Sequence, residues 1–383
     1  MIKIVTIIGA RPQIIKAAAL SRAIKNNYSN AIQEIIVHTG QHYDSNMSQV
    51  FFDELQIPAP NYNLNVGSAS HGKQTAMMIQ GIEEILMKEN PNYLVLYGDT
   101  NSTLAGGIAA SKIHVPVVHI EAGLRSFNKS MPEEINRILC DHVSTLLFSP
   151  TKTGFDNLIN EGFKTQNVAP FNADNPKIYH CGDIMYDNSL YFSSIAENKS
   201  SVLHDLKLKN KQYILSTIHR DNNTDNPARL DAIFRAMQDI SVKKSIDIVV
   251  PLHPRTSKLL ETNLSTETYK SIKQNQLIHL LPPVSFIDMI ALESNSYLVM
   301  TDSGGVQKEA FFFQKPCIIL RPETEWVEIV NSGSCILTDA NYSKIVDAYN
   351  SLTSDKKVLQ FPTIFGDGKA AEFICNEMIK NAK

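Results

Sequence analysis

Short runs of apolar, mostly β-branched residues alternate with longer amphipathic stretches along nearly the whole chain. The first runs are fully apolar or nearly so, a pattern typical of parallel strands that helices cover on both faces. These runs lie at 2–8, 34–39, 93–98, 115–120 and 145–150. Helical patterns lie between them at 13–27, 71–89, 101–112 and 133–142. The alternation predicts βαβ units and a doubly wound α/β sheet.

The same pattern then repeats in the second half of the chain. Its apolar runs lie at 213–218, 246–253, 277–281, 297–302 and 317–321. Since 383 residues exceed one ordinary core, we expect two Rossmann-like domains, at 1–182 and 183–365, with a hinge near 181–190. The segment 366–383 should be a helix that packs back on the N-terminal domain. Ligands of doubly wound domains bind at the carboxyl ends of the strands, so two facing domains would form a central cleft.

Composition narrows the class of protein. With 43% hydrophobic and 20% charged residues the chain is typical of a soluble globular protein, and no run approaches a membrane span. The net charge of −3 disfavours a general nucleic-acid binder. Five widely spaced cysteines without a CxxC pair indicate reduced thiols rather than a disulfide framework or a zinc site. We therefore expect a cytoplasmic protein.

Charged residues follow the strands of the first half. Arg11 and Lys16 flank a helix start after the first strand, where they form either an anion site or a basic surface. Because this turn is no GxGxxG, nicotinamide-dinucleotide binding is disfavoured. Asp99 follows the third strand; it could simply cap the next helix, but Thr100 to Ser102 already supply a cap.

The densest cluster follows the fourth strand. Glu121 stands at the strand exit, where a buried carboxylate is costly unless it is paired or used. Pro132 suits the first turn of a helix, which places Glu133 in that turn. Arg137 comes four residues after Glu133, so a purely structural ion pair would also explain these two.

The strand exits of the second half carry histidines and glycines. His219 and His253 occupy equivalent exits, but the spacing of acidic and histidine residues lacks a metal motif, so we expect no metal. Glycines that open a helix expose N–H donors to phosphate, and an acidic side chain one turn later could accept from ribose hydroxyls. The residues in this arrangement are Ser303, Gly304, Gly305, Glu309 and, after the next strand, Arg321.

In these motifs the chain resembles the non-hydrolysing UDP-N-acetylglucosamine 2-epimerases, a family with the GT-B architecture of two Rossmann-like domains. The resemblance spans essentially the full chain. It rests on eight ordered motifs: GARPQIIK, GDTNSTLAG, HIEAGLRS, PEEINR, IHR, TDSGGVQKEA, ETEWVE and FGDGKA. It implies a UDP-sugar substrate, no cofactor and, we expect, a homodimer.

The resemblance also implies a reaction. The family removes the proton at carbon 2 of the sugar and expels UDP from carbon 1; UDP then adds back while a proton arrives on the opposite face. Two acid/base groups and cations for the leaving diphosphate are needed. The implied catalytic residues are Asp99, Glu121, Glu133 and His219. The implied substrate and UDP residues are Arg11, Lys16, Arg137, His253, Ser303, Gly304, Gly305, Glu309 and Arg321.

Departures from the common family pattern leave the sugar open. Gln13 replaces an acidic residue, and Trp326–Val327 stand where Arg-Pro is commoner. These variants resemble the branch acting on UDP-2,3-diacetamido-2,3-dideoxyglucuronic acid, whose carboxylate Arg125 or Lys129 could bind. UDP-GlcNAc to UDP-ManNAc, for surface-polysaccharide precursors, is the preferred interpretation. The uronic-acid sugar and a GT-B glycosyltransferase are the alternatives.

One further motif indicates regulation. Some family members are activated by their own substrate, and HTGQHYD at 38–44 resembles the region responsible. Gln41 and His42 are therefore possible regulatory residues.

Overall fold

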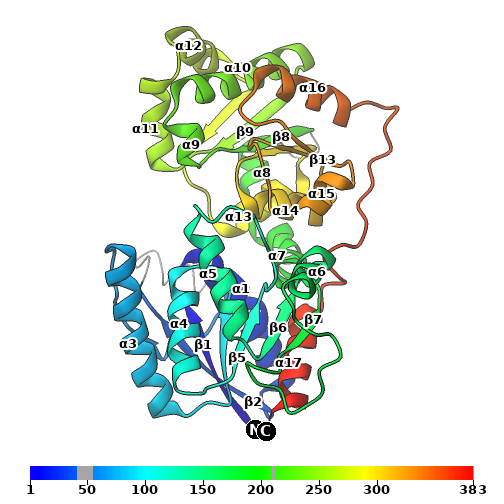
Figure 1. The fold of residues 1–383 in the computed structure, drawn as a ribbon. Helices are drawn as coiled ribbons and strands as arrows, with labels where there is room; N and C mark the ends of the chain where they lie inside the picture. Colours follow the sequence, from blue (N-terminus) through cyan, green and yellow to red (C-terminus); the bar gives the residue numbers. More distant parts are fainter. Residues whose placement is uncertain (41–54, 209–211, 383) are drawn as a thin grey trace. The chain divides into compact units, whose positions relative to one another are not determined.

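The structure is a computed structural model that describes residues 1–40, 55–208 and 212–382. The chain forms two compact units, one of residues 1–190 and 363–383 and the other of residues 191–362. Each unit contains its own parallel sheet, and helices cover both sheets (Figure 1). No helix within the described ranges is both long and apolar enough to cross a membrane.

The first unit is built on a sheet with the order β3-β2-β1-β4-β5-β6-β7 in the described residues. The strands are β1 (Ile2–Ile8), β2 (Ile32–His38), β3 (Tyr62–Asn63), β4 (Tyr93–Tyr97), β5 (Val117–Ile120), β6 (Leu146–Ser149) and β7 (Lys177–His180). The helices are α1 (Arg11–Ala23), η1 (Ile24–Tyr28), α3 (His71–Glu89), α4 (Asn101–Lys112), α5 (Pro132–Val143), α6 (Lys152–Asn160) and α17 (Ala370–Asn381). The strand order reverses between β1 and β4, which is where doubly wound folds bind ligands.

The core of the first unit explains its nearly continuous apolar strands. Val5 and Ile7 of β1 are fully buried against Met78 and Ile82 of α3 and further residues of α4. Parallel strands covered on both faces need such runs, because neither face meets water. The predicted alternation of strands and helices is confirmed here.

The second unit has the order β10-β9-β8-β11-β12-β13 in its described part. The strands are β8 (Tyr213–Thr217), β9 (Asp247–Pro251), β10 (Ile278–Leu281), β11 (Leu298–Thr301), β12 (Cys317–Ile319) and β13 (Cys335–Leu337). The helices are α8 (Val202–Asp205), α9 (Asp221–Thr224), α10 (Pro227–Lys244), α11 (Pro254–Asn263), α12 (Thr266–Gln274), α13 (Phe286–Asn295), α14 (Gly304–Phe312), α15 (Val327–Asn331) and α16 (Tyr342–Leu352). Its order reverses between β8 and β11.

Helix α7 (Ile184–Lys199) contains the point where the first unit gives way to the second. Near its start, Asn188 donates to the Ile15 carbonyl and accepts from Arg22. Phe192 packs edge-on against Phe286 of the second unit's α13, with ring centroids 5.1 Å apart. Because the first part of α7 belongs to the first unit and the rest to the second, the boundary between the units lies inside this helix, within the hinge predicted near 181–190.

The C-terminal segment belongs to the first unit. Asp187 caps α17 by accepting from the backbone N–H groups of Ala370 and Ala371, at 3.2 and 2.8 Å. Further along α17, Glu372 accepts from Asn27 at 3.0 Å. The last helix is therefore held by residues far away in the sequence.

Candidate active site

In the first unit the sequence-predicted residues gather at the exits of β1, β4 and β5. Lys16 of α1 forms an ion pair with Glu121, which directly follows β5. Only 9% of the surface of Glu121 is exposed. A Cβ at Gly98 would lie 3.0 Å from the Lys16 Nζ and 3.1 Å from the Glu121 Oε2. Gly98, at φ +62°, thus leaves the space that this pair occupies.

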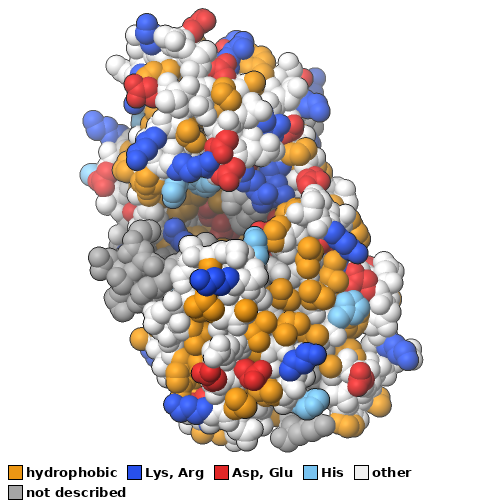
Figure 2. Space-filling model, turned by 60° about the vertical axis from the view of Figure 1, so that its left-hand side comes forward, with side chains coloured by type: hydrophobic (Ala, Val, Ile, Leu, Met, Phe, Trp, Pro, Cys, Tyr) orange, Lys and Arg blue, Asp and Glu red, His pale blue; other side chains and the backbone are white. Residues whose placement is uncertain are grey.

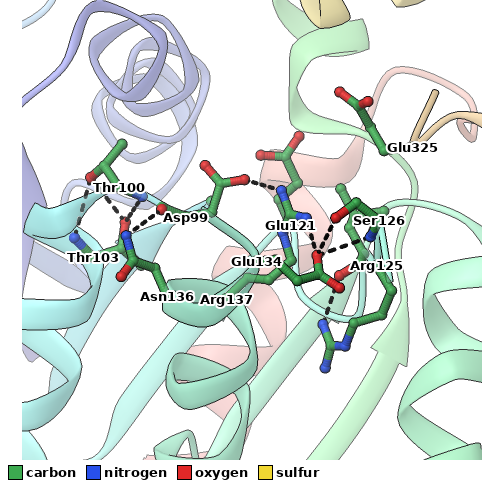
Figure 3. A network of polar contacts seen from close by, with 12 residues as sticks. Asp99, Thr100, Thr103, Glu121, Arg125, Ser126, Glu134, Asn136, Arg137 and Glu325 are labelled. Carbon is green, nitrogen blue, oxygen red and sulfur yellow. Dashed lines mark hydrogen bonds and ion pairs between the residues drawn. The ribbon is translucent and has the colours of Figure 1, made fainter. Parts of the chain in front are cut away.

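Asp99 belongs to another group of charged residues in the first unit, which Figure 3 shows from close by. Arg137 of α5 pairs with Asp99 through one guanidinium nitrogen and with Glu134 through the other, the latter at 2.6 Å. The Glu134 carboxylate also accepts from the Ser126 backbone N–H at 2.9 Å and the Phe127 N–H at 2.9 Å. Although burial opposes it, these bonds and Arg137 lower the pKa of Glu134. Arg137 is thereby fixed as the partner of Asp99.

The Glu133–Arg137 ion pair considered from the sequence is wrong. Arg137 contacts Glu134, three residues earlier, because the 126–127 backbone holds Glu134 beside it. Glu133 instead lies exposed in the first turn of α5, which begins at Pro132 as expected. A partially exposed carboxylate at a helix start is accessible to a ligand.

The Thr100 side chain caps α4 by accepting from the Thr103 N–H, as the sequence predicted. Asp99 is therefore not needed as a cap. Asn136 was not singled out from the sequence, yet its amide donates to the Asp99 carbonyl at 2.9 Å. Its position one residue before Arg137 on α5 places both on the strand exit of β4.

Gln13, the departure from the common motif, has a specific place in the first unit. Its side-chain oxygen accepts from the Ala10 N–H at 3.1 Å, and its nitrogen donates to the Tyr97 carbonyl at 3.1 Å. A carboxylate could not donate to Tyr97. The Gln13 amide therefore ties the start of α1 to the end of β4.

Arg125 does not lie free for a sugar carboxylate. Its side chain is 1% exposed and binds Asp141 at 2.8 Å and Glu161 at 2.6 Å. These partners could not be recognised from the sequence, because Asp141 lies in α5 and Glu161 directly follows α6. Lys129, the other cation suggested for that role, is exposed.

In the second unit α14 opens directly on glycines, as predicted. Ser303 is its N-cap and accepts from the Val306 N–H. A Cβ at Gly304 would lie 2.5 Å from the Glu325 Oε1, whereas one at Gly305 would meet its first neighbour only at 3.8 Å. Arg321, 6% exposed, pairs with Glu325 at 3.0 Å. Glu309 is 8% exposed in the same helix.

A buried carboxylate that the sequence did not single out organises the loop carrying His219. Asp302, fully buried at the end of β11, accepts from the His219 N–H at 2.9 Å and the Arg220 N–H at 3.1 Å. It also accepts from the Asn223 amide at 3.0 Å. Asp302 thus holds the backbone of the loop that carries His219, and the His219 side chain is exposed.

His253 is placed differently. It is exposed at the start of α11, where its Nδ1 accepts from the Arg255 N–H at 3.3 Å. Arg255 pairs with Asp221 and Asp225. Gln41 and His42 lie outside the described residues. Within the described ranges there is no group of three or more His, Cys, Asp or Glu side chains that could hold a metal.

Residues 23–379 match the family model described as UDP-N-acetylglucosamine 2-epimerase. The chain belongs to this epimerase family. A UDP-N-acetylglucosamine 2-epimerase homolog from Methanococcus maripaludis is 46% identical over 99% of both chains. A UDP-2,3-diacetamido-2,3-dideoxy-D-glucuronate 2-epimerase from Pseudomonas aeruginosa is also 46% identical over 99% of both.

A solved structure of an epimerase of this family aligns along the whole chain. It is the UDP-GlcNAc 2-epimerase of Methanocaldococcus jannaschii in complex with UDP-GlcNAc and UDP, with a TM-score of 0.83, 39% identity and 99% coverage of both chains. The predicted class of two Rossmann-like halves is confirmed, and so is the resemblance stated from the motifs. Like its family, the chain is an isomerase.

Proposed function

We propose that this epimerase interconverts UDP-GlcNAc and UDP-ManNAc without net hydrolysis. The observation that carries the proposal is the pair of carboxylates at neighbouring strand ends of the first unit. Asp99 follows β4 and Glu121 follows β5, its parallel neighbour, and each carboxylate has its own cation. Two positioned carboxylates suit a reaction that removes a proton from one face of carbon 2 and returns one to the other.

The reaction would run by elimination and re-addition. One base takes the proton from carbon 2 as the bond from carbon 1 to the UDP oxygen breaks, which leaves a glycal-type alkene and UDP. UDP then adds back to carbon 1 while a second acid delivers a proton to the other face of carbon 2. Asp99, Glu121 and the exposed Glu133 are the proton-transfer candidates.

UDP binding is assigned to backbone and cationic groups. The N–H groups of Gly304 and Gly305 at the start of α14 suit the diphosphate, and Glu309 suits the ribose hydroxyls. Arg321 with its partner Glu325 adds a fixed cation on the same side. Arg11, Lys16, Arg137, His219 and His253 complete the set of substrate residues.

A second candidate substrate is UDP-2,3-diacetamido-2,3-dideoxyglucuronic acid. The Pseudomonas aeruginosa relative supports it, since its 46% identity equals that of the Methanococcus maripaludis UDP-N-acetylglucosamine 2-epimerase homolog. Trp326 supports it as well, since this departure from the common family pattern resembles the uronic-acid branch. The Trp326 ring centroid lies 4.2 Å from the Lys308 Nζ. Because Arg125 is committed to Asp141 and Glu161, the sugar carboxylate would need another cation.

Proton NMR in deuterated water tests both candidates. The enzyme is incubated separately with UDP-GlcNAc and with the uronic-acid sugar nucleotide. We expect the 2-epimer of UDP-GlcNAc with deuterium at carbon 2 and no accumulation of free sugar. Turnover of the uronic acid alone would replace the preferred substrate by the second one. Irreversible release of UDP and sugar would indicate a hydrolysing epimerase, and turnover only with an added acceptor would indicate a glycosyltransferase.

We also propose that the enzyme is a homodimer. Ile135 and Leu139 lie one turn apart on α5 and are 44% and 43% exposed, and Met77 of α3 is 47% exposed. Figure 2 shows hydrophobic side chains gathered on one face of the first unit. Such a patch on a soluble protein supports self-association. Light scattering should give twice the chain mass for the wild type, and Leu139→Lys should lower it; a monomeric wild type would contradict the proposal.

The proposed setting is the cytoplasm, with the product serving as a precursor of surface polysaccharide. All five cysteines are free thiols, which suits a reducing compartment.

A further inference from the structure

A fully buried histidine joins the two strand exits that carry the proposed acid/base residues. His119 of β5 is 0% exposed. Its Nδ1 lies 2.6 Å from the Asp141 Oδ1, and its Nε2 lies 2.8 Å from the carbonyl oxygen of Gly98. Both partners are acceptors, so both ring nitrogens must donate. Only the imidazolium form carries two N–H groups.

The surroundings of the ring stabilise this charge. Burial disfavours it, but the adjoining Cys140 and the Asp141 carboxylate outweigh burial and raise the pKa of His119 well above its ordinary value. Asp141 in turn contacts Arg125 at 2.8 Å, and Arg125 contacts Glu161. Burial also opposes charge on Asp141, yet His119 and Arg125 lower its pKa. The chain of alternating charges is balanced.

Two members of this chain of charges, His119 and Asp141, hold backbone next to a proposed catalytic residue. Gly98, whose carbonyl accepts from His119, directly precedes Asp99. The Asp141 Oδ2 accepts from the Gly123 N–H at 3.1 Å, two residues after Glu121. Gly98, Glu121 and Gly123 have φ of +62°, +73° and +81°. For Glu121, a residue with a Cβ, this conformation costs about 1–2 kcal/mol and persists only where surrounding contacts enforce it.

We propose that His119 is a positioning residue for epimerisation. As a buried imidazolium, it fixes through the Gly98 carbonyl the backbone from which Asp99 reaches the substrate, without touching the substrate itself. The inference rests on the proposed function. Misplacing a reacting group by about 1 Å can cost 10²-fold in rate, so the loss should fall on kcat.

A simpler explanation is that His119 only stabilises the core. Two variants of His119 distinguish the explanations, because each keeps one of its two bonds. The amide nitrogen in His119→Asn can replace Nδ1 and contact Asp141, but it leaves Gly98 without a donor. In His119→Gln it can replace Nε2 and contact Gly98, but it leaves Asp141 without this donor.

We expect both variants to have lowered melting temperatures. The kcat of His119→Asn should be at least about 10-fold below that of His119→Gln, since only the latter retains the donor to Gly98, with KM within about threefold for both. Equal kcat values, or kcat losses that simply follow the melting temperatures, would overturn the proposal. His279→Asn is the matched control: this histidine of β10 also pairs with an aspartate, Asp247 of β9, at 2.6 Å, but it lies in the second unit. Its kcat should match the wild type.

A second measurement needs neither a variant nor turnover. In protein labelled with ¹⁵N-histidine, one imidazolium among the eleven histidines should keep both ring protons at pH 8. A spectrum with only neutral rings at that pH would overturn the inference even if His119→Asn failed to fold. If the wild type leaves carbon 2 of both sugar nucleotides undeuterated, the proposed function fails instead, and the NMR result on His119 still stands.

Discussion

The charged residues at the strand exits of the first unit (the first cluster) and those at the strand exits of the second unit (the second cluster) are held in place by different contacts. In the first unit, charged side chains hold one another: Lys16 pairs with Glu121, and Arg137 pairs with Asp99. In the second unit, backbone predominates. Ser303 and two glycines open α14, while Asp302 accepts from the backbone N–H groups of the loop after β8.

The difference matches the chemistry proposed for each cluster. Proton transfer requires particular side-chain atoms at fixed positions, so it depends on individual carboxylates and on the contacts that orient them. Anion binding requires open N–H groups, which a helix start provides without a side chain. The first cluster should therefore be sensitive to neutralising one charge, and the second to adding one methyl group.

The largest expected effect is on turnover in the first cluster. Asp99→Asn and Glu121→Gln should each lower kcat by at least about 10²-fold, since general acid–base groups contribute about 10²–10⁴. UDP affinity should change little, because the residues proposed to bind UDP, in α14 and at Arg321, lie in the second unit. Deuterium incorporation at carbon 2 measures the first quantity and calorimetry with UDP the second.

An exposed carboxylate of the same unit provides the control. Asp156 forms an i,i+4 pair with Lys152 on α6, and its side chain is 44% exposed. Asp156→Asn should keep wild-type kcat. If Asp99→Asn or Glu121→Gln also turned over near the wild-type rate, that residue would have no part in proton transfer.

The next effect is on UDP affinity in the second cluster. Gly305→Ala should weaken UDP binding by about 10-fold or more, because the added methyl group would keep the diphosphate away from the N–H groups at the start of α14, and a lost hydrogen bond to a charged group costs about 1.5–3 kcal/mol. The protein itself has room for the methyl group, whose nearest atoms would be the Ser303 Oγ at 3.8 Å and the Glu309 Oε2 at 3.9 Å. Calorimetry with UDP measures the change.

Gly72→Ala is a closely matched control. Gly72 is also the second residue of a helix, α3, and a Cβ there would meet nothing within 4 Å. Both substitutions should leave the melting temperature unchanged or raise it slightly, as glycine-to-alanine changes do in helices. Equal UDP affinity in the two variants would remove the start of α14 from the UDP site.

The sequence predicted the parts of the fold and site that depend on local signals. Long apolar runs located the central strands, and the Thr100 cap and the glycine-opened α14 appeared where expected. The strands β3, β7 and β13 were not predicted, since no long apolar run in the sequence marks them. Their places depend on the neighbouring strand.

Side-chain partners could be predicted only where the spacing decides them. The choice of Glu134 over Glu133 as the partner of Arg137 depends on N–H groups from the loop at 126–127. Arg125 is buried because Asp141 of α5 and Glu161, the residue after α6, contact it. These choices of partner depend on tertiary packing between segments that lie apart in the sequence.

The smallest effect concerns a buried acid beside the second cluster. Glu293 of α13 is 1% exposed and its Oε2 has no hydrogen-bond partner. Burial, and then the charge of Glu309, raise its pKa well above the ordinary value. In the first unit, Glu121 and Asp99 are paired with cations. In the second unit, by contrast, Glu293 is a protonated acid close enough to Glu309 to be affected by its charge.

Replacing this acid by its neutral amide should remove a pH dependence of stability. Because the folded-state pKa of Glu293 is raised, the native state keeps a proton that the unfolded chain releases above pH about 4, so its contribution becomes less favourable as pH rises. Glu293→Gln should therefore lie close to the wild type at pH 5 and exceed its free energy of unfolding at pH 8. Urea unfolding followed by fluorescence of Trp326, the single tryptophan, reports on this unit.

Exposed Glu261 of α11 provides the control, and Glu261→Gln should parallel the wild type at both pH values. An equal difference between Glu293→Gln and the wild type at pH 5 and pH 8 would mean that Glu293 is charged in the folded protein, and the contrast between the two clusters would then not extend to this acid.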